Sequence, residues 1–203
     1  YKTVTKKITV KKDTETNRMR VVLRKSGDDN SGNPIDTVRP DLGLNSYSQV
    51  LSSGFSHAGV ISGNGSLYMW GLNDYGQLGD GTYEFRLLED SVKVLDHVVS
   101  IDFKKWTSGA VTKDGSLYMW GSNDYGQLGD GTKTNRNTPV KVMDNVTSVS
   151  VGGYFCSAAI TKDRSLYMWG YNACGQLGNG TTIDEATPVK VLDDVVVVDT
   201  DGS

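Results

Sequence analysis

The sequence predicts an all-β fold built from repeated four-stranded antiparallel sheets, the blades of a β-propeller. The first observation is a segment at residues 66–82 that recurs almost unchanged at 116–132 and 165–181. The second is the spacing of its tryptophans: Trp70, Trp120 and Trp169 are 50 and 49 residues apart, a period that suits one small sheet per repeat. The third is that each repeat contains short apolar runs separated by turn residues, which predicts almost no helix.

Three regions are predicted along the chain. Residues 1–25 alternate apolar and polar side chains in two runs, which predicts a β-hairpin-like leader. Residues 26–46 are rich in Gly, Asp, Asn, Ser and Pro and lack apolar periodicity, which indicates a linker. Residues 47–203 then hold three repeats, at about 47–98, 99–146 and 147–194, followed by the start of a fourth.

The four strands of a blade are clearest in the third repeat. Residues 146–151 alternate valines with polar residues, and residues 157–161 form a second run of small side chains. Residues 166–169 are apolar at every position, as expected for a strand in a sheet that is covered on both faces. We expect the tryptophans at the equivalent positions, Trp70, Trp120 and Trp169, to be buried at blade interfaces. Residues 188–192 supply the fourth strand.

The third and fourth runs are joined by a glycine-rich loop. In the first repeat it contains Gly76, Gln77, Leu78 and Gly79. We expect Leu78 to be a buried plug, and Gln77 to satisfy backbone groups that a tight loop leaves unpaired. No Lys-Ser/Thr pair follows this loop, so a phosphate-binding role is not favoured.

Charge and composition exclude some classes of function. The formal net charge of -3 divides into +7 for residues 1–25 and -10 for the remainder. An acidic repeat region argues against nucleic-acid binding, which needs a positive surface. No apolar run approaches the roughly 20 residues that span a bilayer, so membrane insertion is not expected. Cys156 and Cys174 have no second pair, and we expect two free thiols.

Three segments now support a family resemblance: HAGVISGNGSLYMWGLNDYGQLGDGT, TSGAVTKDGSLYMWGSNDYGQLGDGT and CSAAITKDRSLYMWGYNACGQLGNGT. They resemble the repeat of the regulator of chromosome condensation family in their Trp-Gly, Asn and Gly-Gln-Leu-Gly positions. The resemblance implies a β-propeller, usually of seven blades, of which three repeats are seen here. Related propellers include a nucleotide exchange factor for a small nuclear GTPase and secreted bacterial inhibitors of β-lactamase.

The resemblance also suggests a location. The Ser-Leu-Tyr-Met-Trp-Gly motif is most similar to that of bacterial surface or secreted members. We therefore expect an extracellular or cell-surface protein, with the cytoplasm as the alternative. The leader resembles the final strand of a bacterial immunoglobulin-like domain.

The repeats depart from the family pattern at two places. His57 keeps the family's histidine at the start of the second strand, whereas Thr107 and Cys156 replace it. Lys104 and Lys105 stand where the third repeat has a glycine pair, so we expect that turn to differ.

Catalytic chemistry is not favoured by these residues. The chain has two histidines, His57 and His97, and neither has an obvious catalytic neighbour in the sequence. We therefore expect no enzyme and no cofactor or metal. Acidic residues six apart leave a repeated calcium site as an alternative to simple turn formation, although the third repeat breaks the pattern: Asp74 and Asp80, Asp124 and Asp130, then Ala173 and Asn179.

The favoured function is a binding and scaffold module that contacts a protein partner through variable loops. The first repeat has a longer, aromatic loop at residues 83–88, and aromatic and Arg side chains are typical of partner contacts. The alternative is that Phe85 and Leu87 pack against the neighbouring blade. Two other functions remain open, a regulator of a small GTPase and a purely structural spacer. The candidate partner-binding residues are Tyr75, Tyr83, Phe85, Arg86 and Tyr125.

Three repeats are fewer than the four to eight blades that typically close a propeller. We therefore expect either further blades in a longer protein or self-association of this chain.

Overall fold

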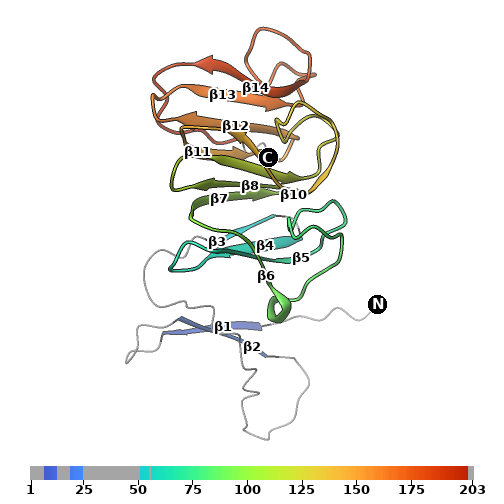
Figure 1. Cartoon of the computed structure of the whole chain (residues 1–203), viewed down its shortest axis with the longest axis vertical. Coiled ribbons are helices and arrows are strands. Elements are labelled where there is room, and N and C mark those ends of the chain that lie inside the picture. The colour runs from blue at the N-terminus through green and yellow to red at the C-terminus, as the bar shows by residue number, and fades with distance from the viewer. Residues whose placement is uncertain (1–6, 13–18, 25–50, 55, 201–203) are drawn as a thin grey trace, which may run out of the picture. The chain divides into compact units, whose positions relative to one another are not determined.

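The protein is described by a computed structural model that covers residues 7–12, 19–24, 51–54 and 56–200 (Figure 1). The chain forms two compact units, Tyr1–Tyr47 and Ser48–Ser203. The predicted linker at 26–46 lies outside the described residues.

The first unit contains the predicted hairpin. Strands β1 (Lys7–Lys12) and β2 (Met19–Arg24) pair antiparallel, with Ile8 opposite Leu23 and Val10 opposite Val21. The hairpin is therefore confirmed, whereas its membership in an immunoglobulin-like domain stays a prediction.

The second unit consists of three antiparallel sheets, each of four strands in sequential order, which confirms the predicted fold class. Figure 1 shows these sheets, called blades 1, 2 and 3 from here on, following one another in chain order. Blade 1 holds β3 (Leu51–Ser53), β4 (His57–Ile61), β5 (Leu67–Gly71) and β6 (Val92–Leu95). Blade 2 holds β7 (Val98–Lys104), β8 (Thr107–Thr112), β9 (Leu117–Gly121) and β10 (Arg136–Met143). Blade 3 holds β11 (Val146–Val151), β12 (Cys156–Thr161), β13 (Leu166–Gly170) and β14 (Glu185–Leu192).

Helix is nearly absent, as the repeat pattern predicts. Among the described residues the one helical element is the 3-10 turn η1 (Leu88–Asp90). No helix in the described part of the chain has the length and apolar character needed to cross a membrane.

The hydrophobic cores lie between neighbouring blades. Leu67 and Met69 of blade 1 pack in one cluster with Ile101, Phe103 and Trp120 of blade 2. A second cluster joins blade 2 to blade 3 in the same way. In β9, Trp120 packs in the cluster with blade 1, whereas Leu117 and Met119 pack in the cluster with blade 3. A strand covered on both faces in this way is apolar at every position.

One polar contact is repeated at both blade boundaries. The indole Nε1 of Trp120 donates to the backbone carbonyl of Gln77 at 2.9 Å, and the Ser108 hydroxyl donates to the same oxygen at 2.8 Å. Trp169 and Ser157 of blade 3 make the same bonds to Gln127 of blade 2, at 2.9 and 2.8 Å. We call this arrangement the Trp–Gln contact. It explains why the two halves of the repeat motif, the Trp strand and the glycine-rich loop, recur together.

A glycine is required where the loop meets the tryptophan. Gly79 has φ +75°, and a Cβ atom there would lie 2.7 Å from the Trp120 indole nitrogen. Gly129 stands in the same relation to Trp169. Any larger residue at these positions would push the loop away from the next blade.

The tryptophans differ in burial. Trp120 and Trp169 are fully buried, which confirms the prediction for these two. For Trp70 the prediction of burial at a blade interface is wrong, because this side chain is only partly buried. The physical reason is that blade 1 is the first of the described blades, and no other described blade places its glycine-rich loop over Trp70.

The first turn of the blade differs between blades 2 and 3, as predicted from Lys104 and Lys105. In blade 2 the strand pair continues to Lys104 opposite Thr107, whereas in blade 3 it ends with Val151 opposite Ser157. Blade 2 therefore has the tighter turn, with Lys105 at φ +47°.

The Trp–Gln contact predicts unequal effects of truncating the tryptophans. We expect Trp120→Ala and Trp169→Ala each to lower the free energy of unfolding by about 3 to 5 kcal/mol, because each removes a fully buried ring. Trp70→Ala should cost clearly less, since its ring is already partly exposed. Chemical denaturation of the three variants measures the difference, and equal losses at all three positions would contradict the account.

Candidate functional site

The topology places every long loop at one edge of the blades. In each antiparallel blade the first turn and the loop between the third and fourth strands fall at the same end of the sheet. We call this end the loop rim; its described residues are 54, 56, 72–91, 105–106, 122–135, 152–155 and 171–184. At the opposite end, the turn rim, the described residues form short turns. All five candidate residues from the sequence therefore lie on the loop rim.

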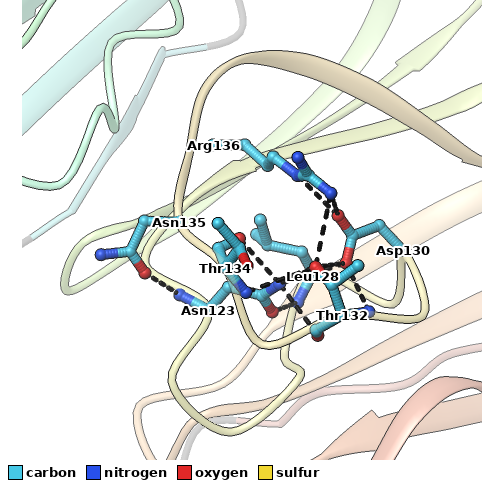
Figure 2. A network of polar contacts seen from close by, with 7 residues as sticks. All are labelled: Asn123, Leu128, Asp130, Thr132, Thr134, Asn135 and Arg136. Carbon is cyan, nitrogen blue, oxygen red and sulfur yellow. Dashed lines mark hydrogen bonds and ion pairs between the residues drawn. The ribbon is translucent and has the colours of Figure 1, made fainter.

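A buried asparagine organises each loop, as Figure 2 shows for Asn123 of blade 2. In blade 2 the Asn123 Oδ1 accepts a hydrogen bond from the Leu128 amide at 2.9 Å, and Nδ2 donates to Asp130 Oδ1 and to the Thr132 carbonyl, both at 3.1 Å. Asn73 and Asn172 make the corresponding bonds in the other blades. The asparagine thus provides bonding that a tight loop cannot supply from its own backbone.

The glutamine and leucine of the loop have the predicted roles. The Gln77 side chain accepts a hydrogen bond from the Tyr75 amide at 2.9 Å, and Gln127 and Gln176 accept the equivalent bonds. Leu78 is fully buried, as are its counterparts Leu128 and Leu177 to within 1%.

An ion pair ties the end of the loop to its middle. Arg86 donates from Nε and Nη2 to Asp80 Oδ2, at 2.9 and 2.7 Å. Blade 2 repeats this pair with Arg136 and Asp130. In blade 3 both residues differ. The side-chain amide of Asn179 donates a hydrogen bond to the Glu185 carboxylate at 3.1 Å, so the two positions stay in contact without forming an ion pair.

The environment of Asp80 sets its protonation. Burial acts to raise the pKa of the Asp80 carboxyl, but hydrogen bonds from Thr82 and the Arg86 guanidinium outweigh it and hold the pKa below its ordinary value. Because the pKa is lower in the folded state, the ionised carboxylate stabilises the fold at neutral pH. This contribution is lost as the pH falls below the ordinary Asp range and through the folded pKa.

This ion pair bears on two hypotheses from the sequence: a repeated calcium site, and Arg86 as a partner-binding residue. The carboxylate that the calcium alternative would require is bonded to Arg86 and Thr82. Among the described residues no group of three His, Cys, Asp or Glu side chains is placed to hold a metal. Arg86 itself was a candidate for partner contact, but its guanidinium is engaged inside the loop and its side chain is 32% exposed.

The candidates Tyr83 and Phe85, and Leu87 beside them, have exposed side chains. Tyr83 is 53% exposed, Phe85 55% and Leu87 47%. The alternative that Phe85 and Leu87 pack against a neighbouring blade is not supported by this exposure.

Phe85 also replaces a structural residue. Its counterparts in blades 2 and 3 are Asn135 and Asp184, whose side chains accept hydrogen bonds from the backbone amides of Asn123 and Asn172 at 2.7 and 3.0 Å. A phenylalanine cannot accept such a bond. In blade 1 an exposed aromatic ring therefore stands where the other blades use a loop-stabilising polar group.

The remaining candidates, Tyr75 and Tyr125, belong to a larger group. The Tyr75 ring stacks on Trp106 with centroids 4.8 Å apart. The Tyr125 ring contacts Phe155 at 4.9 Å and Tyr171 at 5.0 Å. We call the full set the aromatic strip: Tyr75, Lys105, Trp106, Tyr125, Tyr154, Phe155 and Tyr171.

Lys105 joins the two halves of the aromatic strip. Its ammonium lies 4.4 Å from the centroid of Phe155 and 5.7 Å from that of Tyr154, within the range of cation–π attraction. Lys105 also precedes Trp106 in the chain, so the strip runs from blade 1 through blade 2 to blade 3. Sequence analysis missed Trp106 and Phe155, although both occupy the first turn of their blade and thus face the loop of the preceding one.

The one close histidine–hydroxyl pair in the described chain joins two blades. His57 Nε2 lies 3.0 Å from Ser108 Oγ, a neighbour that sequence analysis did not find. Ser108 is fully buried and donates its proton to the Gln77 carbonyl, so its oxygen accepts from His57. Desolvation by burial lowers the pKa of His57 to about 4, against a weaker opposing effect of the Lys105 backbone. The neutral imidazole thus extends the Trp–Gln contact between blades 1 and 2.

Comparison with known proteins places the chain in a family. The regulator of chromosome condensation (RCC1) repeat matches residues 64–101, 114–159 and 163–199, and a second RCC1 repeat model matches residues 98–127 and 146–176. These matches cover more than half of the chain. The protein belongs to the RCC1 repeat family.

Individual relatives match different extents of the chain. The E3 ubiquitin-protein ligase HERC2 of Homo sapiens is 42% identical over 45 residues, which are 22% of this chain and 1% of the ligase. The crystal structure of human WBSCR16 superposes with a TM-score of 0.62 at 25% identity, covering 72% of this chain and 39% of that one. Prp20p from Saccharomyces cerevisiae gives 0.62 at 23% identity, covering 71% of this chain and 38% of that one. The chain thus spans about two fifths of each of these structures.

The loop ion pair predicts a compensating double substitution. Arg86→Ala should lower the free energy of unfolding by about 1 to 3 kcal/mol, because it leaves the buried Asp80 carboxylate without its charged partner. Combining Asp80→Asn with Arg86→Glu installs the pair of blade 3 and should cost less than Arg86→Ala. Urea denaturation of both variants provides the measurement. A double variant that is the less stable of the two would refute the idea that the pair acts as a unit.

Proposed function

We propose that this protein is a non-catalytic binding module that contacts a protein partner through the loop rim. The observation that carries this proposal is the set of exposed and partly exposed aromatic side chains on the loop rim, namely those of the aromatic strip together with Tyr83 and Phe85. Tyr, Trp and Phe supply large contact area with few rotatable bonds, and they are enriched at protein interfaces.

Phe85 and Tyr83 are the strongest candidates within this surface. Both are more than half exposed, and Phe85 replaces a residue with a loop-stabilising hydrogen bond in the other blades. A residue that exposes apolar area at the expense of a structural bond is better explained by an intermolecular contact than by folding. Beneath them, the Asp80–Arg86 pair holds the loop in one conformation, which lowers the entropy cost of binding.

The comparisons support protein binding only in general terms. Prp20 of yeast, which shares the fold at 24% identity, has been crystallised with Kap60 bound to it. The loop rim is mixed in charge, because it carries exposed Asp74 and Asp124 as well as the partly exposed Lys105. Regulation of a small GTPase, a purely structural role and a bacterial surface location all stay predictions.

The proposal is tested by giving blade 1 the loop residues of blade 2. Tyr83→Lys combined with Phe85→Asn removes both exposed rings and should restore an acceptor for the Asn73 amide. We expect this variant to keep the stability of the wild type and to lose retention of proteins from an extract of the source cells, measured by quantitative mass spectrometry. The reason is that the rings contribute to the partner contact and not to the core.

Val99→Ser is the matched control, because Val99 is 53% exposed on β7 close to the turn rim. It should retain the same proteins as the wild type. Retention that is equal in all three chains, or a loss of stability in the loop variant, would reject the proposed surface.

A further inference from the structure

Some carboxylates of the loop rim are not paired within the protein. Their side chains are exposed and form no hydrogen bond or ion pair with any described residue: Asp74, Glu84, Glu89, Asp90 and Asp124. Other carboxylates of the same rim are engaged, as in the Asp80–Arg86 pair. The unpaired set is therefore available to a partner.

The cationic side chains of the described loop rim are all engaged. Arg86 and Lys133 form ion pairs with aspartates of the rim. The Lys105 ammonium lies 4.4 Å from the ring centroid of Phe155. The unpaired charge of this rim is thus negative, and the complementary surface of a partner is positive.

Two of the unpaired carboxylates adjoin a member of the aromatic strip. Asp74 precedes Tyr75, and Asp124 precedes Tyr125. Each tyrosine is partly exposed, while its ring also contacts an aromatic residue of the next blade. We call each of these two pairs an Asp–Tyr unit. The second unit belongs to blade 2, which has a described blade on either side, and Asp124 is exposed with both neighbours in place.

The loop does not need the Asp–Tyr unit for its own structure. Blade 3 has Ala173 and Cys174 at these two positions. Its loop nevertheless makes the same hydrogen bonds, because the Leu177 amide donates to Asn172 and the Cys174 amide donates to Gln176. Both side chains of the unit can therefore change without altering the loop, so folding does not explain them.

A cationic side chain is the ligand that matches a carboxylate beside an aromatic ring. The carboxylate supplies the opposite charge, and the face of the ring attracts a cation. The aromatic strip already contains one such contact, that of Lys105 with Phe155. Arginine suits the site better than lysine, because its planar guanidinium can stack on a ring and also bond a carboxylate through two N–H groups.

We propose that the partner of the loop rim presents arginine side chains, and that each Asp–Tyr unit binds one guanidinium. The aspartate accepts its hydrogen bonds, and the tyrosine ring packs against its plane. The two units lie in successive blades, so one extended arginine-containing segment can contact both. This inference rests on the proposed function, since it states which chemistry the partner surface recognises.

The test measures binding of synthetic peptides to the full chain. The probe is a fluorescent peptide of alternating arginine, glycine and serine residues, and its counterparts carry lysine or glutamate in place of arginine. Fluorescence anisotropy should show the tightest binding for the arginine peptide and none for the glutamate peptide. Asp74→Asn combined with Asp124→Asn should weaken binding of the arginine peptide by about 3- to 30-fold, as expected for the loss of two exposed ion pairs.

Glu89→Gln combined with Asp90→Asn is the matched control. It removes the same amount of charge from two unpaired, exposed carboxylates of the same rim that have no aromatic neighbour in the chain. Binding of the arginine peptide should change by less than about 2-fold, because simple attraction between opposite charges is not enough to form the site. Circular dichroism of both double variants should match the wild type, since none of the four carboxylates has a bonded partner among the described residues.

Two results would overturn the proposal: binding of the arginine peptide that is no tighter than that of the lysine or glutamate peptide, or equal weakening by the two double variants. The variant Tyr83→Lys/Phe85→Asn keeps both Asp–Tyr units and addresses the proposed function separately. If that variant loses the retained proteins while the wild type ignores the arginine peptide, the partner surface stands and the arginine assignment fails.

Discussion

The Trp–Gln contact is the interaction on which the second unit depends. A single backbone carbonyl, at Gln77 or Gln127, receives the indole and hydroxyl protons of the next blade while the ring closes the core beneath it. A buried carbonyl costs free energy when it is left unpaired, so each blade needs its neighbour. The contact also explains the sequence: glycine permits the approach, leucine fills the space below, and tryptophan combines a large apolar ring with one donor.

The residues that stabilise the fold therefore lie apart from the residues that vary between blades. The Trp–Gln contact uses the same residue types at both blade boundaries. The loops of the loop rim are held in place by a buried asparagine and by the Asp80–Arg86 pair or its replacement in blade 3. Side chains that project beyond this network can change without disturbing the core. Tyr83 and Phe85 show such a change, since blade 2 has a lysine and an asparagine at these positions.

Sequence reasoning predicted the strands and the buried Leu78 because the repeat period and the apolar runs are local signals. It erred on Trp70 because burial depends on the neighbour of a repeat, and three near-identical segments cannot reveal which one borders an open face. The role of Arg86 was hidden for a different reason. Its partner lies six residues earlier, and only the bend of the loop brings the two charges together. Likewise, Trp106 faces Tyr75 only once two blades are packed.

The central claim is that the indole protons of Trp120 and Trp169 are bonded to the preceding blade. Hydrogen exchange of the four indole Nε1–H groups, followed by nuclear magnetic resonance, measures this directly. We expect Trp120 and Trp169 to exchange orders of magnitude more slowly than Trp106, which is only partly buried on the loop rim. Exchange of Trp120 and Trp169 at the rate of Trp106 would contradict the account.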